Sequence, residues 1–214
     1  MSRFQPRPEQ IKWIKAALFA LCLVPFMRLV WRAFAGTLGV NPIETITHST
    51  GWWTLALLLI TLTVTPLRRL LDAPWLLRLR RMLGLFAFFY VCVHFTTWIV
   101  FDHFFDWRAV AADIAKRPYI TVGFTAFVLL IPLAATSTNA MVRRLGAAQW
   151  QRLHRFVYLI AILGALHFLW LVKKDIREPM VFAAILAVLL GARLLYRLRQ
   201  KKSTPVVAAR SQTA

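Results

Sequence analysis

Residues 82–101 read MLGLFAFFYVCVHFTTWIVF and contain no Lys, Arg, Asp or Glu. About twenty mostly apolar residues cross a bilayer as a helix, and lipid leaves backbone polar groups no partner outside that helix. Further apolar stretches of similar kind occupy residues 13–35, 50–67, 119–136, 153–172 and 179–197. The pattern predicts an all-α integral membrane protein, a bundle of six transmembrane helices.

The composition agrees with a membrane protein. The chain has 214 residues, 59% of them hydrophobic, with nine Trp and sixteen Phe, more than the core of a soluble domain of this length needs. We expect one transmembrane domain over residues 13–197. Residues 1–12 form a short segment before it, and residues 198–214 are expected to be a basic, disordered tail.

The formal net charge of +19 is explained by topology and not by nucleic acid. The basic residues gather in the segments after the second, fourth and sixth spans, whereas residues 36–50 and 102–117 lack such an excess. Short loops rich in Lys and Arg stay in the cytoplasm. Both termini are therefore expected to be cytoplasmic, and the two poorer segments to face the periplasm or the cell exterior.

Two histidines lie deep in separate spans. His94 lies in the third span and His167 in the fifth, and both spans run outward, so each imidazole is expected about 7–11 Å inside the outer boundary. Ionisable groups in a bilayer are costly unless they have a partner. A level pair of imidazoles favours axial ligation of one haem between the third and fifth helices. The alternative is that each imidazole only forms a hydrogen bond to a neighbouring helix.

Any haem must be held without covalent attachment. Cys22 and Cys92 both lie within apolar spans, and the chain has no CxxCH motif. His94 and His167 are accordingly the candidate ligands of the iron.

His154 marks the inner end of the fifth span. It precedes His167 by thirteen residues, about 20 Å along a helix and about 140° around it. No histidine occupies the matching level of the third span, where Arg80 and Arg81 stand. His154 is a candidate ligand of a second haem, a candidate partner of a quinone or flavin, or an interfacial residue.

Three further residues are weaker candidates. His48, beside Trp52 and Trp53, could contact a quinone, a partner protein or the outer haem, or belong to an interfacial aromatic belt. Arg28 and Arg81 are candidates for the haem environment, with snorkelling as the alternative for Arg28. His103, next to Asp102, is expected to be a solvated residue at the end of its span.

The residues also resemble a known family. The stretch WQRLHRFVY at residues 150–158, followed by HFLW at 167–170, is similar to the W-x-x-L-H-x-x-x-Y and downstream His pattern of ferric-reductase-like transmembrane domains. RRMLGL at 80–85, RPY at 117–119 and TSTNAM at 136–141 extend the similarity to about residues 10–200. Within that superfamily the chain most resembles haem-binding membrane subunits of bacterial periplasmic protein-methionine-sulfoxide reductase systems.

The resemblance implies a b-type cytochrome of the bacterial inner membrane. Such a subunit takes electrons from the respiratory quinone pool and passes them to a periplasmic molybdopterin-containing reductase, its partner in a heterodimer, which repairs methionine sulfoxide in proteins. The family's haem ligands carry over to His94, His154 and His167, and members are also described as binding FMN. Larger relatives have a second histidine on the third span and a cytoplasmic nicotinamide domain, neither of which this sequence contains.

Two other classes of function compete with a cytochrome. A small haem-free transporter or channel could use Arg28 and the histidines as an ion path, although the spans contain no acidic relay. A membrane assembly factor could use the histidines to pack its helices.

Overall fold

The computed structural model describes residues 5–172 and 175–202, and every regular element within them is helical. The α-helices are α1 (Pro8–Phe34), α2 (Pro42–Leu70), α3 (Leu77–Thr97), α4 (Trp107–Lys116), α5 (Pro118–Ala135), α6 (Asn139–Leu145), α7 (Ala147–His154), α8 (Phe156–Leu171) and α9 (Arg177–Lys202). Six segments are long and apolar enough to cross a membrane, with α7 and α8 together making one of them. The predicted bundle of six transmembrane helices is confirmed.

The connections contain more helix than expected. Helices α4, α6 and α7 are short and were not anticipated from the apolar pattern. Asp106 caps α4, because its carboxylate accepts hydrogen bonds from the backbone N–H groups of Arg108 and Ala109 at 3.0 and 3.1 Å. Helix α9 continues to Lys202, so residues 198–202 are helical where a disordered tail was expected. Residues 203–214 of that tail lie outside the described residues.

Helix α2 forms the centre of the bundle. It packs most extensively against α3 and also contacts α1, α8 and α9, while α5 and α8 form a second closely packed pair. Its leucines at 55, 57, 58, 59 and 62 are all buried in the core. Burying apolar side chains on every face marks this helix as the one that contacts the least lipid.

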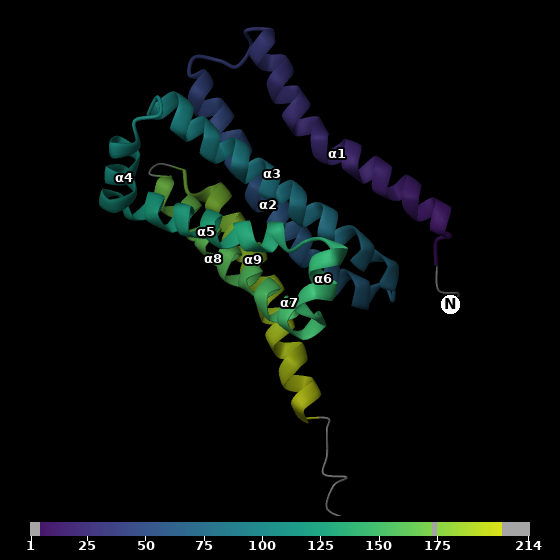
Figure 1. The fold of residues 1–214 in the computed structure, drawn as a ribbon. Helices are drawn as coiled ribbons and strands as arrows, with labels where there is room; N and C mark the ends of the chain where they lie inside the picture. Colours follow the sequence, from purple (N-terminus) through teal and green to yellow (C-terminus); the bar gives the residue numbers. More distant parts are fainter. Residues whose placement is uncertain (1–4, 173–174, 203–214) are drawn as a thin grey trace, which may run out of the picture.

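The bundle has two distinct ends. Figure 1 shows the start of α1 and the end of α9 at the same end as α6, α7 and the turn between α2 and α3. Helix α4 stands at the opposite end. The basic clusters at Arg68–Arg69, Arg80–Arg81 and Arg143–Arg144 therefore share an end with the start of α1 and the end of α9.

Helix α1 is pinned to the bundle by one tyrosine. Pro25 interrupts α1, and the Tyr90 hydroxyl of α3 enters the helix there. It accepts a hydrogen bond from Phe26 N at 3.0 Å and donates one to Cys22 O at 2.8 Å. The hydroxyl thus bridges the pair that would ordinarily bond directly within the helix, and a side chain inserted in this way is a recognised cause of helix bending.

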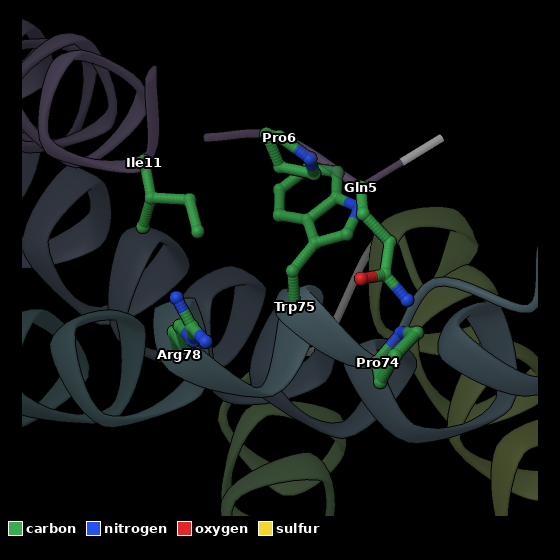
Figure 2. Close-up of a pocket in the computed structure, with 6 residues that line it drawn as sticks. All are labelled: Gln5, Pro6, Ile11, Pro74, Trp75 and Arg78. Carbon is green, nitrogen blue, oxygen red and sulfur yellow. The ribbon is translucent and has the colours of Figure 1, made fainter. Parts of the chain in front are cut away.

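The N-terminal end of α1 has a second attachment. A small cavity of about 140 Å³ lies between this end and the α2–α3 connection, and Figure 2 shows the Trp75 indole reaching toward Pro6 beside Gln5. Ile11 and Arg78 also line it, and Ile11 is buried. Elsewhere α1 presents large apolar side chains outward, as a lipid-facing helix does.

Candidate functional site

His94 lies against the N-terminal part of α2. Its Nδ1 is 2.9 Å from the backbone carbonyl oxygen of Thr47 and 3.4 Å from the hydroxyl of Thr50. A carbonyl can only accept, so Nδ1 carries the proton and Nε2 keeps its lone pair. A Cβ on Gly51 would lie 3.0 Å from Cε1 of the ring. The glycine therefore gives the imidazole room against the helix backbone.

His167 has the same arrangement on the other side of the bundle. Its Nδ1 is 2.7 Å from the carbonyl oxygen of Tyr119 in α5. A Cβ on Gly123, four residues after Tyr119, would lie 2.6 Å from Nδ1 and therefore collide with the ring. Thr47 and Gly51 have the same spacing. Each histidine accordingly lies over a carbonyl at one position and a glycine four residues later.

The two imidazoles face a common space. Their ring centroids are 6.3 Å apart and the planes are inclined by 82°. Two imidazoles that share one metal ion, with metal–nitrogen bonds of about 2.1 Å and ring centres roughly 1.1 Å behind the nitrogens, have centres about 6.4 Å apart. An imidazole that binds a metal commonly donates its other N–H to a backbone carbonyl. The residues present therefore fit a pair of axial ligands on one iron.

His154 is held differently. It is the last residue of α7. Arg155 separates α7 from α8, so His154 and His167 belong to two successive helices. Its Nε2 is 3.1 Å from the Thr136 hydroxyl, and its ring stacks on Trp150 with centroids 3.8 Å apart. The Thr136 hydroxyl donates to Pro132 O at 2.6 Å, so it accepts from His154 Nε2–H.

A cavity of about 270 Å³ opens beside His154. Arg80 and Arg81 of α3 also line it, and Arg81 donates to the Asn139 side chain at 2.6 Å. The structure thus brings Arg81 together with His154 and not with the pair of His94 and His167.

The remaining candidates, His48 and Arg28, belong neither to the pair of His94 and His167 nor to the cavity beside His154. His48 is 3.8 Å from Glu178, and its ring contacts Phe168, the neighbour of His167, with centroids 5.9 Å apart. Arg28 is exposed on α1, and no hydrogen bond or ion pair joins its side chain to another described residue.

The expectation for His103 was wrong. Its side chain is only 10% exposed, lies 3.3 Å from Asp113 and contacts the Trp98 ring. Helix α4 folds back over the end of the third span and encloses it, which the sequence pattern did not reveal.

Sequence reasoning missed Gly51, Gly123 and Thr136, the residues that determine how the histidines sit. A glycine near the start of each of the second and fourth spans was the available signal, because small residues in membrane helices permit close approach.

Comparison with known proteins identifies the family of this chain. The family model described as "Ferric reductase like transmembrane component" matches residues 50–165. A relative from Herminiimonas arsenicoxydans, named "Protein-methionine-sulfoxide reductase heme-binding subunit MsrQ", is 54% identical over 99% of this chain and 98% of its own length. Relatives with the same name from Ralstonia nicotianae and Rhodospirillum rubrum are 54% and 52% identical over 87% and 88% of this chain, and over 87% and 91% of their own lengths.

The six membrane-spanning segments and the similarity over nearly the full chain both indicate the same family of membrane proteins. This multi-pass membrane protein belongs to the family of ferric reductase like transmembrane components and, within it, to the group whose members are named MsrQ heme-binding subunits.

Proposed function

We propose that this protein is the haem-binding, electron-transferring membrane subunit of a bacterial protein-methionine-sulfoxide reductase system. The relatives' name supports the system. The pairing of His94 with His167 is the observation that carries the haem, because both rings donate through Nδ1 to a carbonyl and keep Nε2 free. Their centroid distance of 6.3 Å suits one iron between them.

His94 and His167 would hold a b-type haem, which supplies one-electron redox chemistry when bound. The carbonyls of Thr47 and Tyr119 fix the tautomer and orientation of each imidazole. Gly51 and Gly123 let each ring lie against the helix backbone. Packed aromatic rings, among them Phe95 on Phe127 at 4.6 Å, keep water from this level of the bundle.

We also propose an orientation in the membrane and a route for the electrons. Both termini and the basic end of the bundle face the cytoplasm of the inner membrane, so the haem lies in the outer half of the bilayer. Electrons come from the quinone pool and leave to a periplasmic molybdopterin-containing partner, on which methionine sulfoxide is reduced. Residues 13–197 form the electron-transfer domain, and the segments outside it are cytoplasmic.

A reduced-minus-oxidised absorption spectrum of the purified full-length protein, expressed with sufficient haem, tests this function. We expect b-type Soret and α bands, and reoxidation of the reduced haem when the periplasmic partner and a methionine sulfoxide substrate are added. A protein without these bands would refute the cytochrome assignment and leave a haem-free transporter or assembly factor. Bands that persist without reoxidation by the partner would refute the assignment to the sulfoxide reductase system.

A further inference from the structure

The cavity beside His154 is lined by basic, polar and apolar side chains. Its polar lining residues are Thr61, Arg80, Arg81, Ser137, Trp150 and His154, and the rest of the lining is Leu, Val, Ala or Gly. Leu58 of α2, Leu85 of α3 and Leu130 of α5 belong to membrane spans, so the cavity lies inside the apolar region at the basic end of the bundle. An amphiphile dissolved in lipid could enter such a site.

Most of the polar groups in the lining already use their protons. The hydroxyls of Thr61 and Ser137 donate to backbone carbonyls at 2.7 Å. The Trp150 indole donates to Thr136 O at 2.9 Å. Since His154 donates through Nε2, its Nδ1 is the ring atom left to accept a hydrogen bond. The cavity therefore offers one imidazole acceptor and the guanidinium donors of Arg80 and Arg81.

These groups suit a small ring with hydroxyl and carbonyl oxygens better than a second haem. Among the described residues that line the cavity, His154 is the single His, Met or Cys, so they offer no second axial ligand of these types. The volume of about 270 Å³ falls just below the roughly 300–1,000 Å³ of sites for larger ligands. A hydroquinone ring presents hydroxyl groups to an acceptor and oxygen atoms to guanidinium donors.

Aromatic rings occupy the level between this cavity and the histidine pair. Phe88 lies one turn beyond Gly84 of the cavity and stacks on Phe127, with centroids 6.4 Å apart and planes within 9°. Phe127 in turn stacks on Phe95, the neighbour of His94, at 4.6 Å. Three stacked aromatic rings thus lie between the level of the cavity and the level of the histidine pair.

We propose that the cavity lined by His154, Arg80 and Arg81 binds the headgroup of a membrane quinol. This inference rests on the proposed function, since a haem between His94 and His167 is the electron acceptor. Oxidation of one quinol to quinone releases two electrons and two protons. The proposed haem would accept the two electrons one at a time, and the proposed periplasmic partner would reoxidise it after each. One proton leaves through the hydrogen bond to His154 Nδ1 and the other through water at the basic end of the bundle.

The experiment compares His154→Leu with His103→Leu, a control histidine outside the cavity. Equilibrium dialysis measures binding of decylubiquinone to the full-length protein, and anaerobic stopped-flow spectroscopy measures haem reduction by decylubiquinol. We expect His154→Leu to keep the wild-type haem-to-protein ratio and its reduction by dithionite. Quinone binding and the rate of reduction by quinol should each fall at least ten-fold, with His103→Leu unchanged.

Two further variants separate the cavity from a general loss of fold. Ala134→Phe fills the cavity while leaving His154 in place, and we expect it to abolish quinone binding without loss of haem. His154→Gln, which can donate to Thr136 and still accept, should recover much of the binding that His154→Leu loses.

Several results would overturn the quinol site. Loss of about half the haem in His154→Leu would assign the cavity to a second haem, and loss of tightly bound FMN would assign it to a flavin. Unchanged quinone binding in both His154→Leu and Ala134→Phe would remove the site altogether. Failure of the proposed function looks different, because the wild-type protein would then lack b-type bands whether or not quinone binds.

Discussion

The pair of His94 and His167 and the separate His154 use opposite nitrogens for their hydrogen bonds. His94 and His167 donate through Nδ1 to carbonyls of α2 and α5, which leaves Nε2 free on both rings. His154 donates through Nε2 to Thr136 and lies flat on Trp150. The three histidines are thus arranged for different tasks. The partner of the second nitrogen, more than depth in the membrane, distinguishes a ligand pair from a hydrogen-bonding site.

The largest expected effect comes from removing a member of the pair of His94 and His167. His94→Ala and His167→Ala each remove one proposed haem ligand, so haem affinity should fall by more than the ~10–100-fold typical of losing a residue that orients a ligand. The haem-to-protein ratio of the purified variants measures this. His103→Ala serves as the control, because His103 lies beside Asp113 of α4 and Trp98 and is not one of the proposed ligands. An unchanged haem-to-protein ratio in both His94→Ala and His167→Ala would refute the proposed pair of ligands.

A second prediction tests the glycines that seat the rings. A Cβ at position 123 would lie 2.6 Å from His167 Nδ1, so Gly123→Ala must displace the imidazole and lower haem affinity about 10–100-fold. Gly51→Ala should cost less, because its closest contact is 3.0 Å from His94 and a small shift relieves it.

Gly191→Ala is the matched control for this series, because nothing lies within 4 Å of a Cβ at that site. Haem titration of the three apo-proteins should rank the losses as Gly123, then Gly51, then Gly191. Equal haem affinity in Gly123→Ala and Gly191→Ala would show that the space beside His167 does not matter.

The sequence predicted the spans and the histidines but not how the histidines are held. Length and hydropathy suffice for membrane helices, because the bilayer demands about twenty apolar residues, and all six were found. Matching depth was enough to pair His94 with His167. The carbonyls of Thr47 and Tyr119 carry no signal of their own in the sequence, since every residue has a carbonyl. The apolar residues of α4 do recur at helical spacing, but the position of this helix over His103 arises from tertiary packing, which periodicity does not detect.

A third prediction concerns the attachment of α1, which lies outside both sites. Tyr90→Phe removes the hydroxyl that bridges Phe26 N and Cys22 O, and an unsatisfied buried polar group costs about 1–3 kcal/mol. Thermal unfolding in detergent should show a lower midpoint, while the haem-to-protein ratio stays at the wild-type value. A loss of haem in Tyr90→Phe would mean that α1 also supports the ligand pair.

The smallest expected effect distinguishes the two groups near His94 Nδ1. The Thr47 carbonyl lies at 2.9 Å, whereas the Thr50 hydroxyl lies at 3.4 Å and donates its proton to Ile46 O at 2.8 Å. The carbonyl therefore provides the hydrogen bond that orients the ring, and the hydroxyl adds little. Thr50→Val keeps the shape of the side chain, so haem affinity should change by less than about two-fold, well below the loss in an outer partner that holds a ligand. A loss as large as that of Gly51→Ala in the same titration would move the orienting role from the carbonyl to the Thr50 hydroxyl.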